Sequence, residues 1–190
     1  MKKLLPWIIL TTALTVLFSL IGLWYLPHFL TARAVKRIYE RRKTGVPINQ
    51  MTYGVLRNAG TDIVVRDNPD TVTSLAVYDL SDRPLRVKCV IPPRDNYWSV
   101  SFFDWNTDNY RVINDRVARA KEFDVVLIKP GTQYQKRGDE EVIVAPSTRG
   151  IVLIRMIVAD RQDKDELARL REVQKQSRVV PIDPWGGDRD

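Results

Sequence analysis

The sequence is poor in the side chains on which many enzymes and metal sites depend. It contains one cysteine, Cys89, and one histidine, His28, among 190 residues. These counts exclude an internal disulfide, a cysteine-rich zinc site and, within the body, a serine–histidine–aspartate triad. Cys89 lies in an alternating apolar segment, so we interpret it as a core residue rather than a nucleophile. Glycine-rich phosphate-binding motifs are also missing, and we therefore expect no metal and no cofactor.

The excess of positive charge is confined to the first third of the chain. The formal net charge is +7, and residues 28–60 hold seven basic side chains against Glu40 alone. Residues 61–160 hold 14 basic and 15 acidic side chains, which nearly cancel. A nucleic-acid-binding domain carries its basic surface on the folded body. We therefore expect no nucleic-acid partner.

One long apolar run lies near the N-terminus. Residues 4–26 form 23 consecutive positions without a charged side chain. As a helix they would extend about 34 Å, which exceeds a hydrocarbon core of about 30 Å. Trp7 near one end, and Trp24 and Tyr25 near the other, are the residues that membrane interfaces favour. We predict a transmembrane anchor over residues 1–27, because the alternative, a cleaved signal peptide, has an apolar core of only about 7–15 residues.

Two features of this region give opposite orientations. Six basic residues follow the run within residues 33–43, and only Lys2 and Lys3 precede it. The positive-inside rule then places the body in the cytoplasm. A short basic start before an apolar run is also how an export signal begins, which places the body outside. The charges alone leave both orientations open.

Residues 28–60 are predicted to form a basic juxtamembrane helical linker. Leu30, Ala34 and Ile38 repeat every four residues, with Val35 and Tyr39 beside them, which indicates an amphipathic helix that ends near Gly45. Its basic face either contacts anionic lipid or is an ordinary solvated surface.

From Ile63 the apolar period changes from 3.6 to 2, which predicts a mainly β body over residues 61–182. Proline, glycine, asparagine or aspartate separates the strands, and no crossover helix lies between them. This pattern predicts an antiparallel β-sandwich or jelly roll. Asp163, with Glu166 three residues later, predicts a capped C-terminal helix, and residues 183–190 are predicted to be a flexible tail. The predicted strands are 71–79, 85–91, 97–104, 109–114, 124–128, 141–145 and 151–158.

A series of short motifs over residues 45–182 resembles the family called domain of unknown function 1254. The family typically reads Asn-Arg-Asp-Thr-x-Tyr-Ser, followed by Asp-Leu-Ser with a proline shortly after. The matching residues here are Asn68-Pro69-Asp70-Thr71-Val72-Thr73-Ser74, Tyr78-Asp79-Leu80-Ser81, Pro84, Asp95-Asn96-Tyr97-Trp98-Ser99, Phe103-Asp104, Thr107-Asp108-Asn109, Pro130, Pro146 and Arg155.

The resemblance implies a β-sandwich that often occurs beside a companion domain of unknown function numbered 1214. Members are often exported, which favours a single-pass protein of the inner membrane with its body in the periplasm. The family supplies no assigned catalytic residues. Pro69 and Thr73 replace the usual arginine and tyrosine, which puts in doubt any activity that needs those side chains. The companion domain is missing here, so a separate partner chain could supply it.

Carboxylates are the remaining candidates for chemistry. Asp67 and Asp70 flank one predicted turn, and Asp104 and Asp108 flank another. If the two turns met, their carboxylates could form a cation site or an acid/base pair. Alternatively, these side chains stabilise the turns by hydrogen bonds to the backbone.

Aromatic residues and one arginine indicate a second candidate surface. Tyr97, Phe103, Trp105 and Tyr110 lie in one predicted hairpin, as in a sugar- or lipid-binding groove, a partner interface or a sandwich core. Arg155 lies within an apolar strand and needs a carboxylate partner, for which Asp79 or Asp104 is expected, or else lines a pocket.

The sequence therefore favours a membrane-anchored binding or accessory subunit over an enzyme. The alternative is a carboxylate-dependent hydrolase or isomerase that uses Asp70 and Asp104. The predicted ligand or partner surface comprises Asn68, Asp70, Asp104, Trp105, Asn109, Tyr110 and Arg155.

Overall fold

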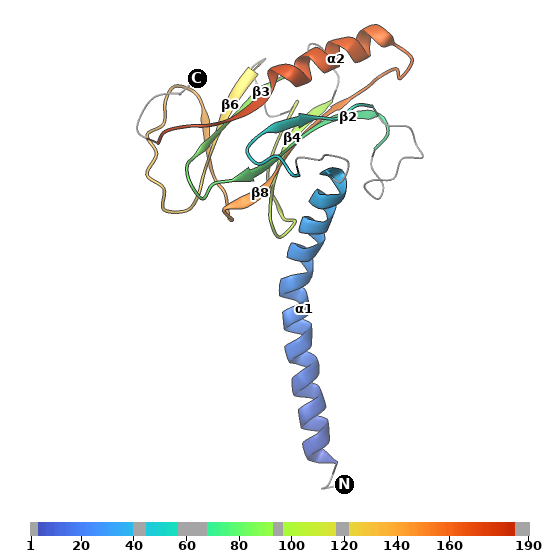
Figure 1. The fold of residues 1–190 in the computed structure, drawn as a ribbon, viewed down its shortest axis with the longest axis vertical. Coiled ribbons are helices and arrows are strands. Elements are labelled where there is room, and N and C mark those ends of the chain that lie inside the picture. Colours follow the sequence, from blue (N-terminus) through green and yellow to red (C-terminus); the bar gives the residue numbers. More distant parts are fainter. Residues whose placement is uncertain (1–3, 40–44, 57–67, 93–96, 117–121, 185–190) are drawn as a thin grey trace.

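A computed structural model describes residues 4–39, 45–56, 68–92, 97–116 and 122–184, and all structural statements below refer to these residues. A long helix, α1, projects from one side of a β-sheet body, and a second helix, α2, lies on the opposite side (Figure 1). Helix α1 spans Leu5–Tyr39 and α2 spans Lys164–Gln176. The strands are β1 (Met51–Tyr53), β2 (Thr71–Asp79), β3 (Leu85–Val90), β4 (Trp98–Asp104), β5 (Asn109–Asn114), β6 (Glu122–Ile128), β7 (Glu141–Val144), β8 (Arg149–Ile157) and β9 (Arg178–Pro181).

These strands form two sheets that pack as a sandwich. The five-stranded sheet has the order β1-β2-β8-β4-β5, and the four-stranded sheet has the order β7-β6-β3-β9. The pairs are antiparallel except β6 and β7, which are parallel. Parallel neighbours need a crossover of about a dozen residues, and residues 129–140 provide it without a helix. The predicted sandwich is therefore confirmed. Its one parallel strand pair among the described strands could not be predicted from the alternation of apolar and polar residues.

The main core lies between the two sheets. Alternate residues of β2, including Val72, Ala76 and Tyr78, contact the four-stranded sheet, where Val87 and Cys89 of β3 belong to the same buried cluster. Burial raises the pKa of the Cys89 thiol, and the side chain is 1% exposed. Its prediction as a core residue is confirmed.

Helix α2 begins where the sequence predicts, and its N-cap closes one end of the sandwich. Asp163 accepts hydrogen bonds from the backbone N–H groups of Asp165 and Glu166. Glu166 reaches beyond the capping residue and accepts from the N–H groups of Ala159 and Asp160, at 3.0 and 2.9 Å. The carboxylate thus ties the helix start to the end of β8 instead of forming the reciprocal bond of a capping box.

Helix α1 continues without interruption through the predicted end of the anchor at residue 27. Its buried residues are Thr31, Val35 and Tyr39, whereas Leu30 is 50% exposed and Ala34 is exposed. The predicted apolar stripe is therefore wrong at Leu30 and Ala34, whereas Ile38 packs against the buried cluster that contains Val35 and Tyr39. Which residues of α1 are buried depends on their contact with the sheet and not on the apolar period of the helix alone.

The last turns of α1 dock on the outer face of the five-stranded sheet. Val35 and Tyr39 form a buried cluster with Val77 of β2. The Tyr39 hydroxyl lies 2.8 Å from the hydroxyl of Thr52 in β1, which donates to the Leu75 carbonyl at 2.7 Å. Residues 51–53 are thus an edge strand within the range predicted as a helical linker. The predicted boundary at residue 60 lies outside the described residues.

Candidate functional site

The predicted site residues lie at different places along β8, the central strand of the five-stranded sheet. Thr71, which follows Asp70, is paired with Ile157 near one end of β8. Asp104 is paired with Gly150 near the other end. At about 3.3 Å per residue, β8 rises about 23 Å between these two pairs.

This separation rules out a shared site for Asp70 and Asp104. The two carboxyl groups of a glycosidase lie about 5–9.5 Å apart, and ligands of one calcium ion lie about 2.3–2.6 Å from it. The hypothesis that the two turns meet is therefore wrong. Asp67 lies outside the described residues.

Asn68 and Asp70 stabilise the turn that enters β2. The Asn68 side chain accepts from the N–H of Asp70 at 3.0 Å, and the Thr71 hydroxyl donates to the Asn68 carbonyl at 2.9 Å. Arg161 donates both to the Pro69 carbonyl and to the Asp70 carboxylate, at 2.9 and 3.2 Å. These contacts match the interpretation of both residues as turn-forming.

Asp104 has the same role in the turn between β4 and β5, and Asn109 contacts the two strands beside it. Asp104 accepts from the N–H groups of Asn106 and Asp108, at 2.8 and 2.9 Å. The Asn109 amide, oriented by its hydrogen-bonding partners, donates to the carbonyls of Phe102 and Arg111. The carboxylate of Asp104 is therefore engaged with the backbone.

The aromatic residues of this hairpin do not share one surface. Tyr110 packs against the main core, and its hydroxyl lies 3.0 Å from that of Tyr78. Burial raises the pKa of both hydroxyls, so they act as a neutral hydrogen-bonded pair. Trp105 instead contacts the cluster formed by α1 and β2. Because the two rings lie in different clusters, they do not line one groove, and the position of Tyr110 agrees with the alternative of a sandwich core.

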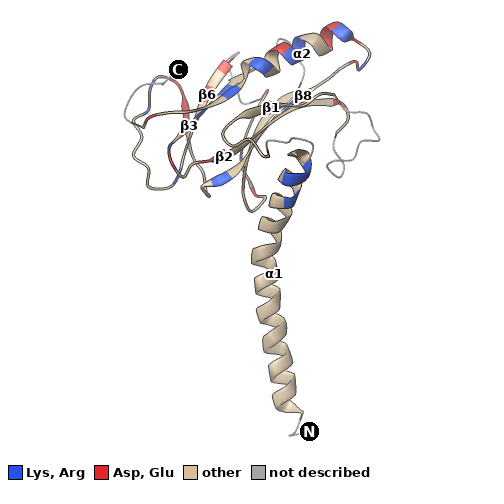
Figure 2. Cartoon of the chain, viewed as in Figure 1, with Lys and Arg blue, Asp and Glu red and all other residues tan. Residues whose placement is uncertain are grey.

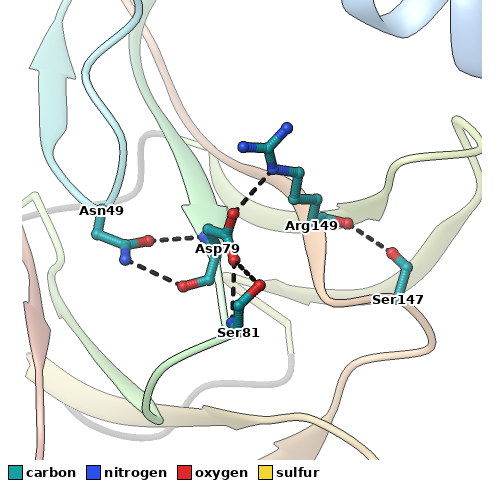
Figure 3. A network of polar contacts seen from close by, with 5 residues as sticks. All are labelled: Asn49, Asp79, Ser81, Ser147 and Arg149. Carbon is teal, nitrogen blue, oxygen red and sulfur yellow. Dashed lines mark hydrogen bonds and ion pairs between the residues drawn. The ribbon is translucent and has the colours of Figure 1, made fainter.

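A polar network around Asp79, which the sequence did not reveal, lies beside Trp105. Figure 3 shows its members Asn49, Asp79, Ser81, Ser147 and Arg149. Arg149 donates to the Asp79 carboxylate at 2.8 Å, and its guanidinium lies 5.9 Å from the centre of the Trp105 ring. Ser147 accepts from the backbone N–H of Trp105 at 3.2 Å. Partial burial acts to raise the pKa of Asp79, but hydrogen bonds from Ser81 and the nearby Arg149 lower it overall.

Asn49 joins this network to the segment that follows α1. Its amide donates to the Asp79 carbonyl at 3.0 Å and accepts from the Asp79 N–H at 2.7 Å. Its positive φ of 57° is a backbone conformation that asparagine tolerates better than most residues. The network thus fixes the end of β2 beside the docked helix, and its ion pair and turn are structural.

Arg155 lies on the outer face of the five-stranded sheet, opposite Thr73 on one side and Ser99 on the other. Its Nε atom is buried and has no hydrogen-bond partner among the residues that the structure describes. The expected partners are engaged elsewhere, because Asp79 pairs with Arg149 and Asp104 accepts from the backbone. The predicted ion pair of Arg155 is therefore wrong.

A charged hollow of about 400 Å³ lies on the outer face of the four-stranded sheet. Glu140 is 7% exposed and accepts from the Tyr134 hydroxyl and the Arg137 N–H, at 2.6 and 2.7 Å. Arg86 lies 3.5 Å from the same carboxylate. No predicted site residue lines this hollow. Across the described ranges, no group of three or more histidine, cysteine, aspartate or glutamate side chains is arranged to hold a metal.

A comparison with family models tests whether the chain belongs to the family that its motifs resemble. The family described as Protein of unknown function (DUF1254) matches residues 48–181. The chain belongs to this family. The DUF1254 match covers the body from just before β1 to the end of β9.

A solved structure shares the fold of this DUF1254 protein at low sequence identity. The VPA0106 protein of Vibrio parahaemolyticus is 14% identical with a TM-score of 0.64, over 87% of this chain and 39% of that chain. This chain thus spans about two fifths of that protein's length. A putative uncharacterized protein from Burkholderia cenocepacia is 17% identical with a TM-score of 0.43, over 60% of this chain and 32% of that chain. No curated protein matches the sequence.

Proposed function

We propose that this DUF1254 protein is a single-pass membrane-anchored β-sandwich that acts as a binding or accessory subunit of a membrane-associated assembly. The observation that carries the proposal is the contrast between the two parts of α1. Its first part is apolar, long enough to cross a bilayer and unburied, whereas its last turns are docked on the body. Leu23 and Trp24 are 74% and 70% exposed, which suits contact with lipid rather than water.

The candidate carboxylates are held in structural hydrogen bonds and ion pairs, which supports a binding role for the protein rather than a catalytic one. Asp70 and Asp104 are tied to Arg161 and to backbone N–H groups, and they lie too far apart to act as a pair. The ion pair of Asp79 and Arg149 fixes a turn beside α1. We therefore do not propose a hydrolase or isomerase.

The proposed partner is a second chain that carries the companion domain of unknown function 1214. The fold comparison supports this idea, because the shared body accounts for only 39% of the Vibrio parahaemolyticus chain. In that protein the same fold occurs beside further polypeptide. We propose that a separate chain supplies an equivalent neighbour to the body described here.

Isolation of the full chain from its native membranes in a mild detergent tests the partner. We expect a stable complex in which mass spectrometry identifies a chain with the companion domain in stoichiometric amount. The anchor would remain associated because its apolar surface stays in the micelle. A monomer that elutes alone at every detergent concentration would contradict the subunit proposal.

The proposed location is the inner membrane, with the body in the periplasm, as in exported members of the family. Labelling of Ala168→Cys in intact spheroplasts tests the orientation, because Ala168 is exposed on α2. The native thiol is a built-in control, since Cys89 is buried and should not react. We expect a membrane-impermeant maleimide to label the variant without lysis. Labelling that requires lysis would place the body in the cytoplasm.

A further inference from the structure

The basic residues of α1 lie beyond its apolar part, within the last turns that dock on the sheet. Arg33, Lys36 and Arg37 are exposed, and no acidic residue occurs anywhere in α1. In Figure 2 the long lower part of α1 has no charged residues, and the blue segments gather near the body. The positive charge is thus concentrated just beyond the segment that would span the bilayer.

Docking of α1 turns two of these side chains away from the body. Val35 faces the five-stranded sheet. At about 100° per residue, Arg33 and Arg37 each lie about 160° from Val35, measured by the shorter way around the helix, and Lys36 lies about 100° to its side. Within the described part of the chain, no ion pair involves any of the three. Their charges are therefore available to an external anion.

The helix also sets how far each charge stands from the membrane. At about 1.5 Å per residue, Arg33 lies about 10 Å and Arg37 about 16 Å beyond Leu26, for a helix perpendicular to the bilayer. The headgroup layer is about 5–7 Å thick, and charges act over a Debye length of about 8 Å. A long side chain at residue 33 can therefore reach the headgroups, and residue 37 lies near the limit of their field.

We propose that Arg33, Lys36 and Arg37 form a lipid-contact face that binds the headgroups of anionic phospholipids. This inference rests on the proposed membrane anchor. The docked helix would then act as a rigid spacer that holds the sandwich at a fixed height above an anionic surface. Each side chain is expected to strengthen association with anionic lipid by up to about fivefold, which corresponds to about 1 kcal/mol. The effect should fall in the order Arg33, Lys36, Arg37.

The test uses the full chain in phosphatidylcholine bilayers that contain a trace of spin-labelled lipid. Electron paramagnetic resonance then gives the relative association of spin-labelled phosphatidylglycerol and phosphatidylcholine with the protein. We expect a preference for phosphatidylglycerol of about threefold or more, reduced by 1 M salt. The triple variant Arg33→Gln, Lys36→Gln, Arg37→Gln should lose it. A matched triple variant on α2, Arg169→Gln, Arg171→Gln, Lys175→Gln, should retain it, because α2 lies on the side of the body opposite α1 (Figure 1).

The outcomes separate this inference from the proposed anchor. Equal preference in the two triple variants would overturn the lipid-contact face while leaving the anchor intact. A preference lost only in the α2 variant would also overturn it. If neither lipid shows an immobilised population, the helix does not span the bilayer, and both proposals fail.

Discussion

Replacement of Gly150 by alanine is expected to destabilise the body by more than about 3 kcal/mol. A Cβ atom at this position would lie 2.2 Å from the Phe103 carbonyl oxygen and 2.3 Å from the Tyr78 hydroxyl. Both neighbours are fixed, because β8 pairs with β2 on one side and with β4 on the other. Added atoms in a closely packed interior force backbone shifts that cost about 1–3 kcal/mol, and a clash with a central strand exceeds the usual case.

Chemical denaturation of the full chain in detergent micelles, followed by tryptophan fluorescence, measures this loss. Gly22→Ala is the matched control, because beyond the adjoining residues and backbone of its own helix no described atom lies within 4 Å of the added Cβ. Adding Tyr78→Phe to Gly150→Ala should recover little of the stability, since the clashes with the Phe103 carbonyl and with the ring carbon Cζ of residue 78 remain. An unchanged denaturation midpoint for Gly150→Ala would show that β8 is not packed as described.

The second large effect is expected from Val35→Asp, which should release the end of α1 from the sheet. Val35 is 3% exposed and contacts an apolar cluster that includes Val77. An unpaired carboxylate buried there costs about 3–5 kcal/mol, so the helix end should undock rather than accept the charge. Hydrogen exchange of residues 31–39 should accelerate by about 100-fold, which corresponds to about 3 kcal/mol.

Ala34→Asp provides the control for Val35→Asp. It adds the same charge one residue away, at a position that is exposed. Exchange of residues 31–39 should then remain close to that of the parent protein. Equal acceleration in both variants would indicate that the charge weakens the helix itself and that docking contributes little.

Much of the architecture could be predicted because it depends on local patterns. Strands 71–79 and 109–114 have the predicted bounds, and Asp163 caps α2 as expected. Alternation with a period of 2 marks a half-buried strand, and an N-cap needs only its nearest backbone groups. The pairing of the short strands β1 and β7 could not be predicted from local patterns. It depends on residues that lie elsewhere in the chain.

In the candidate site, too, the roles set by neighbouring residues could be predicted and the pairing of distant residues could not. Turn-forming roles of Asn68 and Asp104 follow from residue type, because short polar side chains hydrogen-bond to nearby N–H groups. The pairing of Asp79 with Arg149 rather than Arg155 could not be read from the sequence. Both arginines belong to β8, and only the register with β2 decides which one lies opposite Asp79.

The sequence by itself determined that the chain has an apolar, membrane-length helix, a mainly β body and few side chains suited to catalysis. These properties follow from composition and from periods of a few residues. Only the tertiary structure decided which face of α1 docks on the sheet, which carboxylate forms an ion pair with Arg149 and how far Asp70 lies from Asp104. Those relations depend on strand register and on contacts between distant segments, which local patterns do not encode.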